Sequence, residues 1–177
     1  MKTNAVIRPA RPADAAALSA LMRRTFLAAN GHCSSAQNVA RFLDDTYTPE
    51  IQAREIRDPD TFTLIIEQDG QWAGFAQLRW GSTPPPEVSL LPTVELGRIY
   101  LDSAFHGRGL AAQLVANLLA AASLRGSRSV WLNVWQEAPQ AIRFYQKHGF
   151  QIVGSSLFRI GDDVKDDWVM TQALPTG

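Results

Sequence analysis

The sequence has little cysteine and no excess of charge. Cys33 is the only cysteine among 177 residues, which excludes an internal disulfide and any zinc site built from several cysteines. The 17 basic side chains balance the 17 acidic ones, so bulk charge does not favour binding to nucleic acid or to an anionic membrane. We therefore expect a cytoplasmic protein with neither kind of partner.

Long apolar runs and metal-ligand patterns are also missing. The longest apolar stretch, residues 110–124, contains Gln113 and Asn117 and falls short of the roughly 20 residues that span a membrane. Arg8 and Pro9 interrupt the start of the chain before a signal-peptide core can form. The 3 histidines are scattered, so no metal site is predicted.

The length and composition of the chain suit one domain with a single hydrophobic core. The length and the 46% hydrophobic content are sufficient for this without disulfides or metal, and we expect residues 1–177 to form that domain. Asn30-Gly31 is expected to end the first helix in a left-handed turn. The elements predicted in the first half are a strand at 5–8, a helix at 13–29, a helix capped by Ser34, a turn or helix from Thr48, and a β-hairpin of residues 61–68 and 71–80.

In the second half, strands and helices alternate. A proline-rich stretch at 81–92 reads as a surface loop. Gly97 lies inside the strand that follows, where a glycine marks a β-bulge or merely relieves crowding. The predicted elements are a strand at 94–101, a helix at 109–124, a strand at 129–135, a helix at 139–148, and an antiparallel pair at 150–158 and 167–173.

The turn between Leu101 and the helix at 109–124 is the most informative segment. Its glycines allow close approach of an anion, and the N–H groups of a first helical turn lack partners at the positive end of the helix dipole. The turn therefore predicts a diphosphate site, although a glycine-bearing loop without a ligand fits the same residues. Gly107, Gly109 and Ala112 also match a dinucleotide fingerprint, but that pattern directly follows a first strand, and here five residues intervene past mid-chain.

Two motifs in this order resemble the GNAT superfamily of N-acetyltransferases. The family signature is Gln or Arg, two residues, Gly, one residue, then Gly or Ala, and here it reads His106-Gly107-Arg108-Gly109-Leu110-Ala111, with His106 replacing the usual first residue. Tyr145-Gln146-Lys147-His148-Gly149-Phe150 is similar to the family's Tyr-x-x-x-Gly-Phe ending. The resemblance covers nearly the whole chain. It implies an α/β fold with a mixed, mostly antiparallel sheet of about six to seven strands and helices on both faces.

The resemblance also implies acetyl-CoA as cosubstrate and a set of residues that bind it. Its pantetheine arm would lie like an extra strand in an opening that the bulge creates between the strands 94–101 and 129–135. Many family members carry Asn where this chain has Ala138, so one contact is lost or passes to water. The implied contacts are Ile99, Tyr100, Leu101, His106, Gly107, Arg108, Gly109, Leu110, Ala111, Ala112, Asn133, Ala138, Tyr145 and Lys147.

Two side chains are candidates for proton transfer. An alkyl amine with a pKa of about 10.4 is mostly protonated at neutral pH, so a base must free it before it attacks the thioester. Glu95 is the candidate, directly or through water, although it also fits a strand-edge residue in a salt bridge with Arg98 or Arg79. The resemblance gives Tyr145 the role of the acid that protonates the thiolate; its helical spacing alone would make it a core tyrosine.

The prediction of the acceptor is based on shorter stretches of sequence. Residues 95–101, 131–135 and 158–163 look like bacterial spermidine/spermine N-acetyltransferases, which implies a small polyamine-like acceptor with a primary amine. A protein or peptide N-acetyltransferase, and a non-catalytic acyl-CoA-binding regulatory module, stay open. Related enzymes often form homodimers through their C-terminal strands, but the sequence does not give the oligomeric state. Four carboxylates fit either an acidic rim for a polycation or an ordinary solvated turn: Asp162, Asp163, Asp166 and Asp167.

Overall fold

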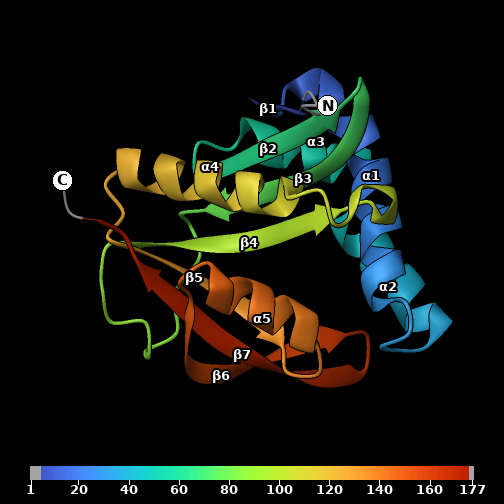
Figure 1. The fold of residues 1–177 in the computed structure, drawn as a ribbon. Coiled ribbons are helices and arrows are strands. Elements are labelled where there is room, and N and C mark those ends of the chain that lie inside the picture. The colour runs from blue at the N-terminus through green and yellow to red at the C-terminus, as the bar shows by residue number, and fades with distance from the viewer. Residues whose placement is uncertain (1–4, 176–177) are drawn as a thin grey trace.

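The protein forms one seven-stranded sheet, seen here in a computed structural model that describes residues 5–175. The strand order is β1-β2-β3-β4-β5-β7-β6, and every neighbouring pair is antiparallel except β4 with β5 (Figure 1). The mostly antiparallel α/β fold predicted from the sequence is confirmed. The strands are β1 (Ala5–Pro9), β2 (Thr61–Gln68), β3 (Gln71–Arg79), β4 (Thr93–Leu101), β5 (Ser129–Trp135), β6 (Gln151–Ile160) and β7 (Asp163–Ala173).

Helices cover both faces of this sheet. One core cluster joins the strands to α4 (Leu110–Leu124) and α5 (Pro139–Lys147), which lie in front of the sheet in Figure 1. A second cluster on the other face contains the buried residues of α1 and α2. The helices of that face are α1 (Ala15–Asn30), α2 (Ala36–Thr46) and α3 (Pro49–Arg57), and two short 3-10 turns are η1 (Pro12–Asp14) and η2 (Ser103–Phe105).

Most helices and strands end where local sequence signals predict, but two of the predicted end residues are wrong. Asp69 and Gly70 have φ of 52° and 77°, as the tight turn of the predicted β2–β3 hairpin requires. The predicted left-handed stop at Gly31 is wrong, because its φ is −60°. A Cβ there would lie 2.5 Å from the carbonyl oxygen of Leu27, so glycine serves close packing instead. Ser35, not Ser34, caps α2, its Oγ accepting from the amide of Asn38 at 3.1 Å.

The β4 strand carries the predicted bulge. On β3, Gln77 faces Arg98 and Leu78 faces Leu96, which leaves Gly97 as the extra residue. A Cβ at Gly97 would lie 3.1 Å from the Arg79 side chain, so the glycine also relieves crowding. Pairing of β4 with β5 covers only three residue pairs and ends at Glu95, directly before the bulge. Beyond that point the two strands are no longer paired.

None of the helices within residues 5–175 combines the length and the apolarity needed to cross a bilayer.

Candidate active site

The unpaired end of β4 turns backbone groups towards β5 at positions where the two strands do not pair. The amide of Asp102 donates to Ala73 on β3 at 2.9 Å, whereas the carbonyl of Leu101 faces away and contacts Nε2 of His106 at 3.1 Å. Successive residues of a strand turn their backbone groups to opposite edges, so those of Ile99 and Leu101 both lie on the β5 side. Since the β4–β5 pairing has ended, this edge is open to an extended ligand that adds backbone-like hydrogen bonds.

The turn that follows exposes the amides at the start of α4. Gly107 and Gly109 have φ of 75° and 74°, a left-handed conformation that favours glycine, and an added Cβ at either would meet no atom within 4 Å. Gly109 is the N-cap of α4 and provides no capping side chain. Within the described part of the chain, the amides from Gly107 to Ala112 have no acceptor, and the first intrahelical bond of this end runs from Gln113 to Gly109. Open amides at a positive helix end fit a diphosphate.

Asp102 holds this turn to the rest of the fold. Its carboxylate accepts from the amide of Ala104 at 3.1 Å and from Nε of Arg24 on α1 at 2.9 Å. These two hydrogen bonds lower the pKa of Asp102, so the carboxylate stays ionised at neutral pH. No local sequence signal indicated the contribution of Arg24, which lies 78 residues earlier in the chain.

Two side chains of the predicted cofactor-binding set, His106 and Arg108, are already engaged. The ring of His106 turns back to the Leu101 carbonyl. The guanidinium of Arg108 donates to Oε1 of Gln68 at 3.2 Å and to the carbonyl of Ala104 at 3.0 Å, and lies 5.2 Å from the centroid of the Phe105 ring. Both side chains therefore brace the turn, while the backbone is what remains free to bind.

Tyr145 lies on α5, on the same face of the sheet as α4. Its ring packs against Phe144 and Phe150, with centroids 5.5 and 5.8 Å away. Its hydroxyl forms no hydrogen bond with any residue of 5–175, and it is not fully enclosed. Burial raises the pKa of the Tyr145 phenol, which therefore carries its proton at neutral pH. The side chain thus combines a packed ring with an uncommitted proton donor.

Glu95 lies on the opposite face, at the last paired position of β4. It is opposite Arg79 on β3 and Trp131 on β5, and its carboxylate accepts a hydrogen bond from the hydroxyl of Ser82. Neither Arg79 nor Arg98 forms the salt bridge with Glu95 that the sequence allowed as an alternative. Glu95 is half-buried and lies where the strands begin to separate.

The two arginines pair instead with Glu55 of α3. Oε2 of Glu55 accepts from Nη1 of Arg98 at 2.7 Å, and its Oε1 lies 3.6 Å from Nη2 of Arg79. Burial, reinforced by the neighbouring Arg98, lowers the pKa of Arg79. Sequence reasoning did not find Glu55, because its partners lie more than 20 residues away and only the fold brings them together.

The remaining predicted contacts lie around α5 and β5. Asn133 is exposed on β5, and its Oδ1 accepts from Oγ of Ser156 at 2.8 Å. Ala138 is the N-cap of α5, without a side chain that could cap it. Lys147 is exposed in the last turn of the same helix. The structure brings Tyr145 and the α4 turn to one face, whereas Asn133 faces the same side as Glu95.

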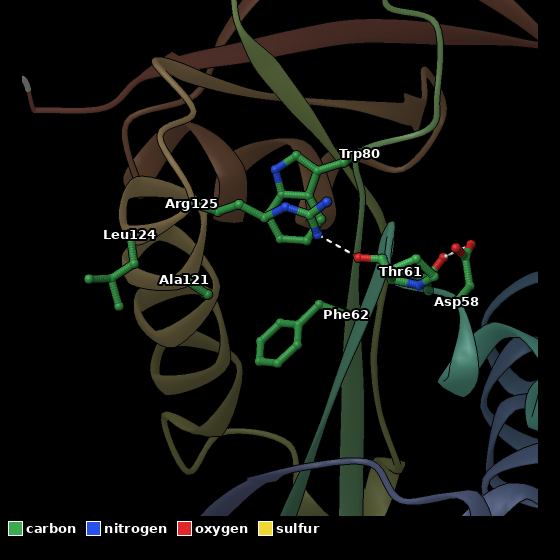
Figure 2. Close-up of a pocket in the computed structure, with 8 residues that line it drawn as sticks. Asp58, Thr61, Phe62, Trp80, Ala121, Leu124 and Arg125 are labelled. Carbon is green, nitrogen blue, oxygen red and sulfur yellow. Dashed lines mark hydrogen bonds between the residues drawn. The ribbon is translucent and has the colours of Figure 1, made fainter.

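A hollow of about 480 Å³ lies elsewhere, at the far end of α4 (Figure 2). Figure 2 shows the Arg125 guanidinium over the Trp80 ring, with Phe62 below them and Leu124 pointing away. The guanidinium carbon is 4.1 Å from the ring centroid. This hollow shares no residue with the glycine turn.

Comparison with known proteins gives a family match and several relatives. The model of the acetyltransferase (GNAT) family matches residues 22–150. An uncharacterized N-acetyltransferase of Mycobacterium tuberculosis is 35% identical over 91% of this chain and 98% of its own length. The N-alpha-acetyltransferase RimI of the same organism is 34% identical over 63% of this chain and 65% of its own. The spermine/spermidine N(1)-acetyltransferase of Bacillus subtilis is 28% identical over 67% and 77%.

A solved structure shares the fold. The PaiA N-acetyltransferase of Thermoplasma acidophilum, crystallised in complex with coenzyme A, superposes with a TM-score of 0.78 over 96% of this chain and 99% of that one. Its sequence identity is 19%, so this likeness concerns the fold alone.

Proposed function

Because the chain belongs to the GNAT family and is an acyl-CoA-dependent N-acetyltransferase, we propose that its acceptor is a primary amine on a polyamine-like small molecule. The observation that carries the cofactor half of the proposal is the open first turn of α4 beside an unpaired strand edge. The choice of acceptor is supported by the Bacillus subtilis relative and by the motifs shared with such enzymes. In this proposal residues 1–177 act as one domain in the cytoplasm.

The backbone supplies most of the proposed cofactor site. The amides from Gly107 to Ala112 would hold the diphosphate, and the β5-facing groups of Ile99 and Leu101 would hold the pantetheine arm. When bound, acetyl-CoA supplies an activated acyl thioester. The positive end of α4 and the charge of Arg108 favour the anionic part of the cofactor at this place.

Two side chains would move protons. Tyr145 keeps its proton at neutral pH, and its hydroxyl has no partner within residues 5–175, so it is available to protonate the leaving thiolate. Glu95 would accept the proton of the acceptor amine, directly or through water, where β4 and β5 begin to separate. The proton that the amine loses and the proton that the thiolate gains are thus handled on opposite faces of the opening.

Replacing Tyr145 tests the acid. We expect Tyr145→Phe to lower kcat by about 10²-fold, the usual effect of one general acid, with little change in the KM for acetyl-CoA. Melting temperature should hold, since no hydrogen bond of the described structure is lost. Tyr47→Phe, at a buried tyrosine of the opposite core, is the control and should keep kcat within about threefold. Full activity of Tyr145→Phe would remove Tyr145 from the mechanism.

Replacing Glu95 tests the base. The activity of an enzyme with a carboxylate base rises with pH as the carboxylate loses its proton. We expect Glu95→Gln to flatten this acid limb in the pH profile of kcat/KM. A profile identical to that of the unmodified enzyme would assign the role to water or to another group.

A thiol-release assay with acetyl-CoA tests the acceptor. The substrates to compare are spermidine, amino acids, aminoglycosides and peptides with a free N-terminus. We expect release with spermidine above all others. Release with peptides alone would support the alternative acceptor, which the match to RimI favours. Coenzyme A binding without release with any amine would indicate a regulatory module.

A further inference from the structure

Asp167 of β7 carries a buried carboxylate without a partner. The residue is 7% exposed, and within residues 5–175 its side chain forms neither a hydrogen bond nor an ion pair. Its two oxygens are not among the enclosed polar atoms that lack a partner, so each still reaches solvent. Burial, with a smaller contribution from Asp166, raises the pKa of Asp167 to about 6. A mostly ionised carboxylate at neutral pH therefore keeps some contact with solvent and has no cationic partner among residues 5–175.

The side chains around Asp167 suit an alkyl ammonium ion. Asp167 is directly opposite Trp135 on β5 and Ser156 on β6, and residues opposite each other share a face of the sheet. The Ser156 hydroxyl donates to Asn133, so its own oxygen still accepts a hydrogen bond. The ring of Trp135, packed 6.0 Å from that of His32, supplies an aromatic face beside the carboxylate. Carboxylate, hydroxyl oxygen and indole are the groups that bind an ammonium.

This place lies near the opening between β4 and β5. Trp135 is four residues past Trp131, where pairing with β4 ends, so it lies on the separated part of β5. Asp167 is one strand further, and neighbouring strands are about 4.8 Å apart, which puts its carboxylate roughly 5–10 Å from the opening. A short polymethylene chain between two amines spans such a distance.

The other three carboxylates of this hairpin differ. Asp163 accepts from the hydroxyl of Ser34 and fastens the hairpin to the α1–α2 loop. Asp162 and Asp166 are exposed. Strand β7 begins at Asp163, four residues earlier than the sequence suggested, and this buries Asp167 while Asp166 stays in solvent. The four residues therefore form neither a common rim nor a common solvated turn.

We propose that Asp167, together with Trp135, binds the second and non-reacting ammonium group of the acceptor. The enzyme then selects diamines and polyamines over monoamines through one charge on β7. This inference rests on the proposed function, because it assigns the acceptor half of the same site.

The test compares two variants and two classes of amine. Thiol release from acetyl-CoA is measured with spermidine and with butylamine for the unmodified enzyme, Asp167→Asn and Asp166→Asn. We expect Asp167→Asn to lose about 10–100-fold in kcat/KM for spermidine, the scale of one charged hydrogen bond, and to change little for butylamine. Asp166→Asn, the exposed neighbour, should match the unmodified enzyme with both amines. Trp135→Leu should lose about threefold to tenfold with spermidine alone.

Several outcomes overturn the inference. Equal losses for spermidine and butylamine would mean that Asp167 serves turnover or folding in general. Equal behaviour of the two Asp variants would mean that overall negative charge, not a site, attracts the amine. If no amine releases thiol, the proposed function fails, and calorimetry of spermidine in the presence of coenzyme A still decides the subsite. If Asp167→Asn leaves the measured affinity for spermidine unchanged, the subsite is refuted. Asp167→Ser replaces Asp167→Asn in this measurement if the Asn variant does not fold.

Discussion

The two ends of α4 carry similar glycines but differ in whether their terminal backbone groups have hydrogen-bond partners. Gly109 at the start and Gly126 after the end are both left-handed, with φ of 74° and 85°. At the far end, the carbonyls of Ala121, Ala122 and Ser123 accept hydrogen bonds of 2.9–3.1 Å from the amides of residues 125–127. At the start, the amides have no acceptor within residues 5–175, and no side chain caps them.

This contrast supports a ligand site at the open end of α4. A helix end normally gains about 1 kcal/mol from a capping side chain, and α2 and α3 of this protein both have one. The closed end of α4 is further covered by Arg125 on Trp80 (Figure 2). In the proposed function, a diphosphate binds the bare amides at the start of α4.

The largest expected effect on coenzyme A affinity comes from placing a negative charge at the open end of α4. Ala111→Glu should weaken coenzyme A binding by at least about 10²-fold, because like charges roughly 4 Å apart repel by several kcal/mol near a protein surface. The same change should raise stability by about 0.3–1 kcal/mol, since an acidic residue suits the first turn. Calorimetry with coenzyme A and thermal melting measure both effects.

A matched control is Ala120→Glu, exposed on the last turns of the same helix. It adds the same charge far from the glycine turn and should leave coenzyme A affinity unchanged. Equal loss of affinity in the two variants would move the diphosphate away from the start of α4.

The glycines themselves allow a finer test. Gly109→Ala and Gly126→Ala each force a Cβ into a left-handed conformation, which costs about 1–2 kcal/mol, and neither Cβ would meet an atom within 4 Å. Their losses of stability should therefore match. Only Gly109→Ala should also weaken coenzyme A binding, by about tenfold, since glycine lets the proposed diphosphate approach the backbone closely at this position. Equal affinities for coenzyme A would show that the ligand does not approach Gly109.

The glycine turn was predictable because its signals are local. Left-handed glycines, a strand end and a helix start all lie within residues 101–112, and the structure places the helix one residue from the prediction. The bulge at Gly97 was equally accessible, since a glycine in a strand has few explanations.

The proposed acceptor side of the site was not predictable in this way. The burial of Asp167 depends on pairing of β7 with both β5 and β6, which is decided by residues up to 38 positions away in the sequence. Glu55 becomes a partner of Arg98 only when α3 packs beside β4. Four aspartates near a glycine read as a solvated turn until the strand register is known, and this register separates the exposed Asp166 from the buried Asp167.

The smallest expected effect is at the closed end of α4. Arg125 donates to the carbonyl of Pro59 and to the carboxylate of Asp60, both at 2.6 Å, and stacks on Trp80. Its side chain is 43% exposed, so Arg125→Ala should cost only about 1 kcal/mol of stability, measured by urea unfolding. Arg125→Lys should recover part of this loss, because it keeps the charge but not the planar stacking group. The kcat and the KM for acetyl-CoA should stay unchanged in both variants, since the backbone groups at this end of the helix are carbonyls that already accept hydrogen bonds. A raised KM for acetyl-CoA in Arg125→Ala would instead mean that the two ends of α4 act together on the cofactor, and that the closed end is not merely structural.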